Sequence, residues 1–229
     1  IIKSIHKIKS INGRIEKIGY LKNGSKVILD YAHTPEALSN CLQNLEQQYK
    51  NRKIAIVFGC GGDRDKSKRS KMGKIANKFC NKIYLTDDNP RNEDPNKIRS
   101  EIRKKIQKSK LEEIPSRQEA ISEAIKNLKT GNILIVAGRG HENIQDYGNN
   151  KKFFSDRYFI IKNIKKKNKF LSKDLKINIL KEESKINLFS SLTKINKASI
   201  NSKEIKKNDI FFAIKGKKND GNLFLNEVF

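Results

Sequence analysis

Four short apolar runs, each followed directly by a polar or glycine-rich segment, limit the folds open to this chain of 229 residues. The runs occupy residues 27–29, 54–58, 82–85 and 133–137. Uninterrupted apolar runs of this length are typical of strands that are buried on both faces of a parallel sheet. Because helical patterns separate the runs, we predict a doubly wound, mostly parallel α/β fold over about residues 25–160.

Helical periodicity supports this alternation of strand and helix. Apolar residues recur at spacings of three and four within residues 35–50, 72–80, 98–106 and 120–128. Thr34 before Pro35 predicts an N-cap followed by proline at the first helical position. The next helix is expected to begin near Ser70. We expect each apolar stripe, including Cys41 and Cys80, to pack in the core and not to bind a cofactor.

The segments that follow the apolar runs carry the polar side chains best suited to chemistry. They occupy residues 30–35, 59–65, 86–91 and 138–142. Ligands of open α/β sheets bind outside the carboxyl ends of the strands. Four polar segments in that position, which we call strand exits, therefore favour a binding site. The exit at 86–91 combines two carboxylates, an amide and a guanidinium, which suits a ligand with ammonium and carboxylate groups. Taken alone, an Asp-Asn-Pro segment is more often a polar turn before the next helix, and its neighbours change that balance.

Four motifs, in order and spacing, resemble the C-terminal domain of the Mur ligases. They read Asp-Tyr-Ala-His-Thr-Pro at 30–35, Phe-Gly-Cys-Gly-Gly-Asp-Arg-Asp at 58–65, Asp-Asn-Pro-Arg at 88–91 and Ala-Gly-Arg-Gly-His-Glu at 137–142. The resemblance begins at residues 13–16 and covers roughly residues 11–160. Within the family the motifs are most similar to those of the MurE type, which adds 2,6-diaminopimelate. The resemblance implies a Rossmann-like sheet and a role in peptidoglycan precursor synthesis.

Seven residues match family positions for the amino-acid substrate, so the resemblance implies that they bind meso-diaminopimelate. They are Arg64, Asp88, Asn89, Pro90, Arg91, Gly138 and Glu142. This substrate has two carboxylate groups, which suit Arg64 and Arg91, and two ammonium groups, which suit the acidic residues. Lysine lacks the distal carboxylate and would leave a buried guanidinium unpaired. The family usually has Lys where Arg139 stands, and Arg and Lys differ in reach and hydrogen-bond geometry.

The reaction that the resemblance implies is ATP-dependent amide formation on UDP-N-acetylmuramoyl-L-alanyl-D-glutamate, the UDP-MurNAc-dipeptide. ATP would activate a carboxyl group as an acyl phosphate, with Mg²⁺ shielding the phosphates, and this domain would position the attacking amine. Arg14 and Asp30 match family positions that touch ATP. His33 lies beside them, although a structural role at the helix start is the favoured interpretation. No Ser, Cys or His arrangement for covalent catalysis is present in the sequence, so no catalytic residue is assigned.

The sequence contains no phosphate-binding loop of the Gly-x-x-Gly-Lys-Thr/Ser type. The central ATPase domain, which would bind most of the ATP and Mg²⁺, is therefore expected to lie outside this chain. We expect the chain to be inactive without the remaining ligase domains. Because no initiating Met is present, the sequence reads as an internal fragment.

The tail predicts a second domain of the same family. We expect a Mur ligase C-terminal domain at 1–162, a linker rich in Lys and Asn at 163–185, and a partial N-terminal domain at 186–229. That last part resembles the domain that holds UDP through Ser202, although Asn201 and Lys203 depart from the family's Asp-Ser-Arg element. It predicts the start of a fused MurF-type ligase, or else a truncated reading frame. A β-hairpin fits its spacing equally well.

Composition keeps alternative functions open. The chain has 50 Lys and Arg against 25 Asp and Glu, a net charge of +25, so a non-catalytic basic module that binds polyanions is one alternative. The lysines are scattered over every expected helix, without an aromatic-interleaved basic patch, so no specific nucleic-acid partner is expected. Another member of the ligase family, such as a folylpolyglutamate synthetase, is a second alternative.

Cysteine usage and hydropathy indicate the compartment. The three cysteines are widely spaced and form no Cys-x-x-Cys pair, which favours a reducing environment over a disulfide framework. No apolar run approaches the length of a membrane span. We therefore expect a cytoplasmic protein without a membrane partner.

Overall fold

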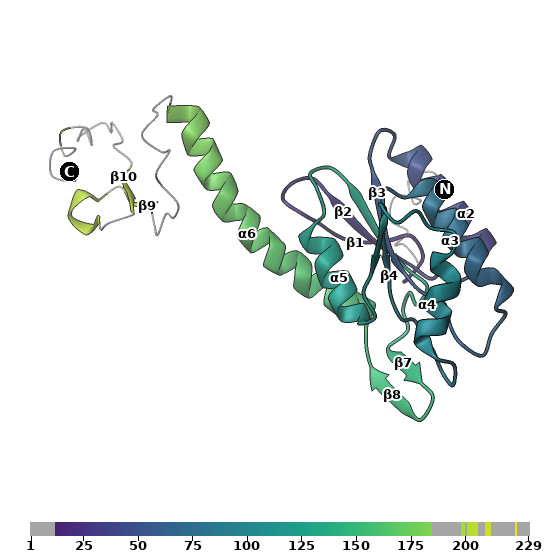
Figure 1. Cartoon of the computed structure of the whole chain (residues 1–229). Helices are drawn as coiled ribbons and strands as arrows, with labels where there is room; N and C mark the ends of the chain where they lie inside the picture. The colour runs from purple at the N-terminus through teal and green to yellow at the C-terminus, as the bar shows by residue number, and fades with distance from the viewer. Residues whose placement is uncertain (1–11, 185–197, 200, 206–208, 212–222, 224–229) are drawn as a thin grey trace, which may run out of the picture. The chain divides into compact units, whose positions relative to one another are not determined.

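The computed structural model describes residues 12–184, 198–199, 201–205, 209–211 and 223 (Figure 1). The chain divides into two compact units, Ile1–Lys169 and Phe170–Phe229. This division falls several residues after the boundary expected at 162/163. The first unit, called unit 1, contains the sheet and all the motifs that follow its strands.

Unit 1 is built on a six-stranded sheet in the order β1-β2-β6-β3-β4-β5. The strands are β1 (Glu16–Tyr20), β2 (Lys26–Asp30), β3 (Ile54–Phe58), β4 (Lys82–Leu85), β5 (Leu111–Glu113) and β6 (Ile133–Ala137). Only the β1–β2 pair in this sheet is antiparallel, and the other four pairs are parallel. The mostly parallel α/β fold expected from the sequence is confirmed.

Helices cover both faces of the sheet (Figure 1). One face carries α2 (Pro35–Gln48), α3 (Ser67–Phe79) and α4 (Pro95–Arg103). The other face carries α5 (Arg117–Lys126) and the first turns of α6 (Asp156–Ser184). Ile160 and Ile164 of α6 are buried, and the Ile164 side chain packs against Gly19 of β1. The two helical layers bury the central strands on both sides, which explains their uninterrupted apolar sequences.

The main core lies between the sheet and the α2–α4 layer. Ile28, Ile56 and Ile135 point into it from neighbouring strands, whereas their chain neighbours belong to the opposite face, as the two-residue period of a strand requires. Each fully buried aliphatic side chain stabilises the fold by roughly 1.5–3 kcal/mol. Cys41 and Cys80 lie in this core as expected, and burial raises the pKa of the Cys41 thiol to about 12.

Hydrogen bonds between neighbouring residues set the starts of α2 and α3, the helices that follow the loops after β2 and β3. The Thr34 side chain accepts a hydrogen bond of 3.2 Å from the Ala37 amide, and Pro35 is the first residue of α2, as predicted. Helix α3 begins at Ser67, three residues before the expected position. Asp65 accounts for the difference, because its carboxylate accepts bonds from the Ser67 amide at 2.8 Å and hydroxyl at 3.0 Å.

The segment expected to be a linker is helical as far as Ser184, since α6 continues without interruption from Asp156. Ile160 and Ile164 are four residues apart, a helical spacing that the surrounding lysines obscure. In the second unit, β9 (Ala198–Ser199) and β10 (Ile210–Phe211) pair in parallel. Within the part of the chain that the structure describes, no helix has the length and apolar character needed to cross a bilayer.

Candidate ligand-binding site

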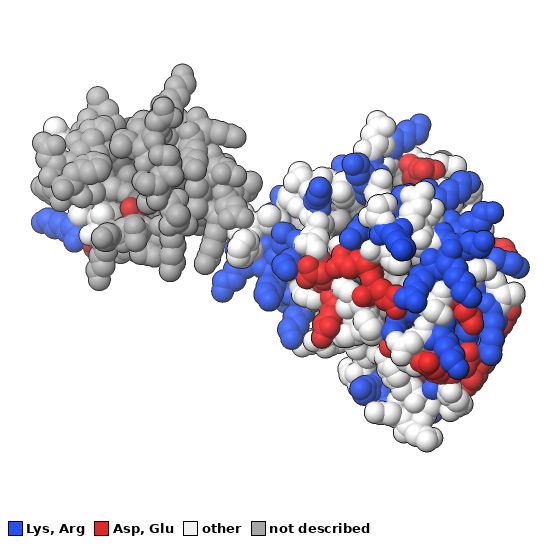
Figure 2. Space-filling model, viewed as in Figure 1, with Lys and Arg blue, Asp and Glu red and all other residues white. Residues whose placement is uncertain are grey.

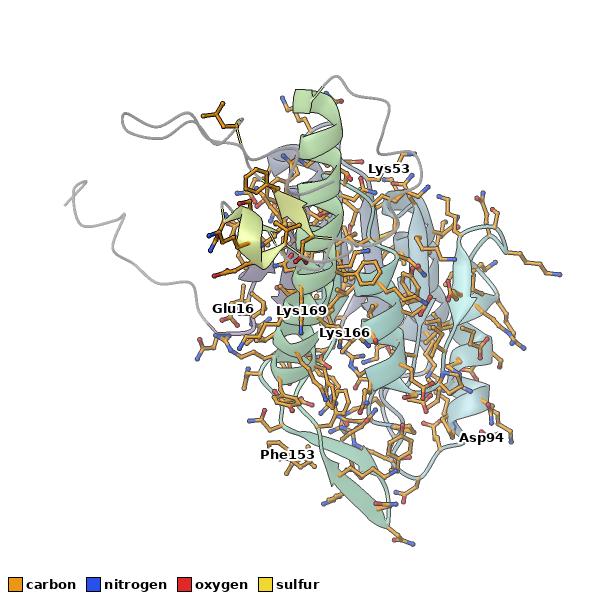
Figure 3. All side chains as sticks on the ribbon, turned by 90° about the vertical axis from the view of Figure 1, so that its left-hand side faces the viewer. Glu16, Lys53, Asp94, Phe153, Lys166 and Lys169 are labelled. Atoms are coloured by element: carbon orange, nitrogen blue, oxygen red, sulfur yellow. The ribbon has the colours of Figure 1, made fainter. Side chains whose placement is uncertain are left out.

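The carboxyl ends of β2, β6, β3 and β4 lie next to one another, because these four strands are consecutive in the sheet and parallel. Lys53, which precedes β3, and Asp94, which follows the loop after β4, lie at opposite ends of the sheet in Figure 3. A hollow of about 570 Å³ opens at the carboxyl end. Residues from all four strand exits line it, which is the arrangement that the strand pattern predicted.

Six of the seven residues expected to contact the amino acid line this hollow. They are Arg64, Asp88, Asn89, Arg91, Gly138 and Glu142. His33 also lines it, together with Tyr31 from the same strand exit. Pro90 lies outside the lining and is buried, with its carbonyl against Gly62. The loops after β3, β4 and β6 thus bring the guanidinium groups of Arg64 and Arg91 and the carboxylates of Asp88 and Glu142 to one hollow.

Asp88 is a buried carboxylate that opens toward the hollow. It is 7% exposed, and none of the described residues donates a hydrogen bond to its side chain. A Cβ on Gly138 would lie 2.7 Å from Asp88 Oδ2, and Gly138 has a φ of +111°, so only glycine fits there without strain. Burial raises the pKa of Asp88, and the charges of Arg117 and Arg139 oppose that rise. A cationic ligand group would supply the partner that this carboxylate lacks.

Glu142 is the second carboxylate of the hollow, and both of its oxygens are oriented by neighbours. Oε1 accepts a hydrogen bond of 3.0 Å from the Tyr31 hydroxyl, and Oε2 accepts one of 3.0 Å from Asn89 Nδ2. The side-chain oxygen of Asn89, Oδ1, in turn accepts a bond of 2.9 Å from the Asp146 backbone amide. The bonds of Asn89 fix its amide orientation, so Asn89 positions Glu142.

Arg91 occupies a left-handed backbone conformation, with a φ of +52°. Its Nη1 donates to the Gly62 carbonyl at 2.7 Å, which connects the loop after β4 to the loop after β3. A Cβ on Gly61 would lie 2.9 Å from the same nitrogen. Arg64 is exposed and donates from Nη1 to the Asp63 carbonyl at 3.1 Å. Arg64 is therefore bonded within its own loop, whereas Arg91 also bonds the neighbouring loop after β3.

The hairpin of β7 (Ile144–Tyr147) and β8 (Asn150–Phe153) braces the Asp-Asn-Pro-Arg loop. Gln145 Nε2 donates to the Asp88 carbonyl at 2.8 Å, and the Arg91 amide donates to the Asp146 carbonyl at 3.0 Å. Phe153, 84% exposed, lies on the outer side of this hairpin (Figure 3). These hydrogen bonds from the β7–β8 hairpin to the backbone of the loop explain how Asp88 and Asn89 are kept in one arrangement.

Asp87 and Asp88 are adjacent but have different surroundings. Asp87 forms an ion pair with Arg99 of α4 and accepts a hydrogen bond of 3.1 Å from the Tyr147 hydroxyl. Arg99 also bonds Glu113 of β5 at 2.8 Å. Burial raises the pKa of Asp87, whereas Arg99 opposes that rise. Asp87 is thus held by structural contacts, whereas the Asp88 side chain accepts no hydrogen bond from the described residues.

Arg139 stands where the family usually has Lys, and it is fully buried. Its Nη2 donates to the carbonyls of Ile144 at 2.7 Å and Phe154 at 3.3 Å, so it holds both ends of the hairpin. Its Nε lies 3.8 Å from Glu142 Oε2. Burial and the neighbouring Arg117 lower the pKa of Arg139. Arg139 does not line the hollow. Its role in this structure is to hold the hairpin that contacts the site.

Of the residues expected to touch ATP, His33 lines the hollow, whereas Arg14 and Asp30 lie outside its lining. The Arg14 guanidinium lies 4.9 Å from the centre of the Tyr31 ring. Asp30 is buried and accepts bonds from the Ile15 amide at 2.7 Å and the Ala32 amide at 2.8 Å. These bonds give Asp30 a structural role in the ligand-free chain. His33 is exposed, with Nδ1 2.8 Å from the Tyr31 carbonyl.

Ser202 belongs to the second unit, where it begins the short 3-10 helix η2 (Ser202–Glu204). The preceding Asn201 caps this helix, since its side chain accepts a hydrogen bond of 3.2 Å from the Lys203 amide. The proposed UDP contact of Ser202 therefore remains a prediction. Among the described residues, no group of His, Cys, Asp and Glu side chains is arranged to hold a metal ion.

Sequence reasoning missed several residues of the hollow. Tyr31 was within a quoted motif but was given no role, and Lys68 and Lys71 of α3 also line the hollow. Their spacing of three places them on one face of the helix. The sequence prediction overlooked this pattern because it started α3 near residue 70, after Lys68. Lys68 Nζ donates to the His33 carbonyl at 3.1 Å, which joins α3 to the loop after β2.

A parallel sheet with a charged hollow at its carboxyl edge defines a Rossmann-like ligand-binding domain. Comparison with known proteins makes the assignment specific. The family model described as "Mur ligase, glutamate ligase domain" matches residues 13–140, which is more than half of the chain. The chain belongs to the Mur ligase family.

Named relatives share this region with the chain. A UDP-N-acetylmuramoyl-L-alanyl-D-glutamate--2,6-diaminopimelate ligase from Rickettsia rickettsii is 47% identical over 166 residues, which cover 72% of this chain and 34% of the relative. A ligase of the same name from Buchnera aphidicola is 45% identical over 169 residues. A solved structure with that name has a TM-score of 0.63 at 36% identity, and the match covers 72% of this chain and 34% of that one. The chain thus spans about a third of the length of these relatives.

Proposed function

We propose that unit 1 binds meso-diaminopimelate as the amino-acid substrate of an ATP-dependent ligase that extends UDP-MurNAc-L-Ala-D-Glu in peptidoglycan precursor synthesis. The observation that carries the proposal is the convergence of two guanidinium groups, Arg64 and Arg91, and two carboxylates, Asp88 and Glu142, in one hollow. The names of the relatives agree with this substrate. A cytoplasmic location follows from the cytoplasmic supply of ATP and nucleotide precursors.

The charges of the hollow complement those of the ligand. Diaminopimelate carries an ammonium and a carboxylate at each end, whereas lysine has an ammonium alone at its distal end. Arg91 presents a fixed planar donor that can bond a carboxylate with two parallel hydrogen bonds. Asp88 has no described hydrogen-bond donor for its side chain and would gain one from a ligand ammonium. Lysine would leave a guanidinium unpaired, so its binding is expected to be weaker.

In the proposed reaction, the contribution of this domain is to bind and orient the amino acid. ATP with Mg²⁺, held mainly by parts of the ligase outside this chain, would phosphorylate the carboxyl group of the dipeptide and release ADP, and attack by the amine would then release phosphate. The amine must lose its proton before it attacks, while the other ammonium stays paired with a carboxylate. Two fixed carboxylates, Asp88 and Glu142, and the fixed Arg91 reduce the orientations open to the substrate. The exposed Arg14 beside Tyr31 is available to a nucleotide phosphate.

Calorimetric titration of the 229-residue chain with meso-diaminopimelate and with L-lysine tests the proposal. We expect diaminopimelate to bind at least about tenfold more tightly than lysine. Arg91→Lys should remove most of that preference, because an ammonium cannot reproduce the planar fork. Arg103→Lys is the matched control, since Arg103 is exposed on α4 and pairs with Glu113 outside the hollow. It should leave both affinities unchanged.

The alternative of a basic module that binds polyanions makes a different prediction. Figure 2 shows Lys and Arg spread over the visible face of unit 1 and interleaved with Asp and Glu. If polyanion binding were the function, the chain would bind single-stranded DNA with strong salt dependence. Such binding would survive Arg64→Ala and Arg91→Ala. That result, together with equal affinity for diaminopimelate and lysine, would contradict the proposed function.

A further inference from the structure

Hydrogen bonds join the loop after β3 to the loop after β4. They therefore connect Arg64 with Arg91, the two residues expected to bind the carboxylates of the amino acid. The Gly62 amide donates to the Asn89 carbonyl at 2.9 Å, and Arg91 Nη1 donates to the Gly62 carbonyl at 2.7 Å. A Cβ on Gly62 would lie 1.9 Å from the Pro90 carbonyl oxygen, so the two backbones approach as closely as glycine permits. These contacts of Gly62 fix the distance between the two loops at this point.

Two residues that are not glycine adopt left-handed backbone conformations in these loops. Asp63 has a φ of +51° and directly precedes Arg64, while Arg91 itself has a φ of +52°. Such conformations persist only where the surrounding structure enforces them. The backbone geometry at both arginines therefore depends on contacts from elsewhere, and Asp63 is the residue whose contacts set the direction of Arg64.

Glu93 and Asn92 supply those contacts. The Asp63 amide donates to Glu93 Oε1 at 2.7 Å, and Asn92 Nδ2 donates to Asp63 Oδ2 at 2.8 Å. We call these two interactions the Asp63 clasp. Both partners lie in the loop after β4, directly after Arg91, so the clasp connects the residue before Arg64 to the residues after Arg91.

Glu93 is itself anchored by a buried arginine of α3. Arg69, 0% exposed, donates from Nη2 to Glu93 Oε1 at 2.9 Å and from Nη1 to Glu101 Oε2 at 2.9 Å. The Arg69 hydrogen bond lowers the pKa of Glu93 to about 2, with a further contribution from the bond to the Asp63 amide. The lowered pKa keeps Glu93 ionised at neutral pH. Glu101 lies on α4 and bonds the same guanidinium without contacting either loop.

We propose that Glu93, anchored by Arg69, is a positioning residue that sets the separation of Arg64 and Arg91 and thereby the length of the dicarboxylic amino acid that the hollow accepts. This inference rests on the proposed function, because it assigns the two guanidinium groups to the two carboxylates of one ligand. A ligand one methylene shorter spans a smaller distance, so it would bind both groups only if they moved closer together. The clasp opposes that movement, so it determines specificity without touching the ligand.

The test compares Glu93→Ala with the matched control Glu101→Ala in the full 229-residue chain. Each variant removes one carboxylate partner of Arg69, but only the first removes the acceptor of the Asp63 amide. Titration calorimetry gives the affinities for meso-2,6-diaminopimelate and for the shorter meso-2,5-diaminoadipate. Hydrogen exchange of the Asp63 amide, followed by NMR, reports the clasp directly. Glu93→Gln, which keeps an acceptor but loses the charge, should give an intermediate result.

In the wild-type chain we expect diaminopimelate to be preferred by at least about tenfold over the shorter homologue. Glu93→Ala should reduce this ratio at least fivefold and abolish protection of the Asp63 amide, whereas Glu101→Ala should change neither. An unchanged ratio in Glu93→Ala, with wild-type binding intact, would overturn the inference and leave the proposed function standing. Equal losses of selectivity in both variants would also overturn it, because Arg69 would then act only through stability. Failure of the wild-type chain to bind diaminopimelate would reject the proposed function, and this inference with it.

Discussion

The Tyr31 hydroxyl donates a hydrogen bond of 3.0 Å to Glu142 Oε1, which joins two loops 111 residues apart in the chain. The loops follow β2 and β6, which are neighbours in the sheet. Burial raises the pKa of Tyr31, and the bond to Glu142 raises it further, so the hydroxyl keeps its proton and remains a donor. The Arg14 guanidinium lies over the ring of the same tyrosine. Tyr31 therefore connects Arg14, which is expected to touch ATP, with Glu142, a carboxylate of the proposed amino-acid site.

Tyr31→Phe should weaken diaminopimelate binding by about threefold to tenfold, the effect of losing one hydrogen bond of ordinary strength that orients Glu142. Glu142 would keep its bond from Asn89 but lose the one that fixes Oε1. Calorimetric titration measures the change. Tyr20→Phe is the control, since Tyr20 is 55% exposed on β1 and lies outside the hollow. Equal affinities for the two variants would mean that Tyr31 does not position Glu142.

Asp88→Asn should separate binding from stability. The folded state holds the Asp88 proton more tightly than the unfolded chain does, because burial raises the pKa above the ordinary value of 3.8. Ionised Asp88 therefore destabilises the fold at pH 7, and the neutral amide should raise the melting temperature. The same substitution should weaken diaminopimelate binding at least about tenfold, since a ligand ammonium loses its buried counter-charge.

The pH dependence follows from the direction of that shift. The stability gain of Asp88→Asn should be present at neutral pH and disappear as the pH falls below 3.8, where wild-type Asp88 is protonated in both states. Diaminopimelate binding by the wild-type chain should strengthen as the pH rises through the raised pKa. Asp94→Asn is the control, because either residue caps the start of α4 equally well. A melting temperature that falls in Asp88→Asn would contradict the argument.

Gly138→Ala should abolish diaminopimelate binding through a steric contact. The new Cβ would lie 2.7 Å from Asp88 Oδ2, so the carboxylate must move, and the φ of +111° adds backbone strain of about 1–3 kcal/mol. Gly131→Ala is a matched control, since its φ is +73° but no atom lies within 4 Å of its Cβ. Both variants should melt at lower temperature, and only Gly138→Ala should lose binding. Retained binding would show that Asp88 is not held against Gly138.

Local sequence chemistry was sufficient to predict the four central strands β2, β3, β4 and β6, the edge of the sheet where they end, and the start of α2. It did not predict β1 or the short parallel strand β5, which lack a continuous apolar run, whereas Thr34 and Pro35 form a capping pattern that depends on neighbours in the chain. Chain neighbours also explain why α3 starts early, through Asp65, although that signal was overlooked. Features that depend on residues within four positions were accessible in principle.

Features that depend on tertiary contacts were not accessible. Asp87 and Asp88 are chemically identical neighbours, and only the position of Arg99 in the folded chain gives the first an ion-pair partner and leaves the second available to the proposed ligand. Arg69 and Arg139 are fully buried, but nothing in a chain with 50 Lys and Arg residues distinguishes them from exposed ones. Their hydrogen-bond partners are side chains 24 or more residues distant or backbone carbonyls, which a sequence pattern does not show.

The buried pair of Arg117 and Asp156 gives the strongest prediction for stability. Both side chains are 0% exposed, and Arg117 bonds both carboxylate oxygens, at 2.8 and 2.7 Å. Arg117 Nη2 also donates to the Ala137 carbonyl at 2.9 Å, directly before Gly138, so the pair supports the floor of the hollow from the α5–α6 side. Removal of one partner leaves a buried charge without compensation.

Asp156→Ala should lower the free energy of unfolding by about 3–5 kcal/mol, measured by urea denaturation followed by circular dichroism. Glu123→Ala, which removes the exposed ion pair with Lys126, should change it by less than about 1 kcal/mol. The double variant Arg117→Met/Asp156→Leu should recover most of the loss, because an apolar pair needs no charge compensation. If the double variant were as unstable as Asp156→Ala, the instability would come from packing and not from the unpaired Arg117 charge.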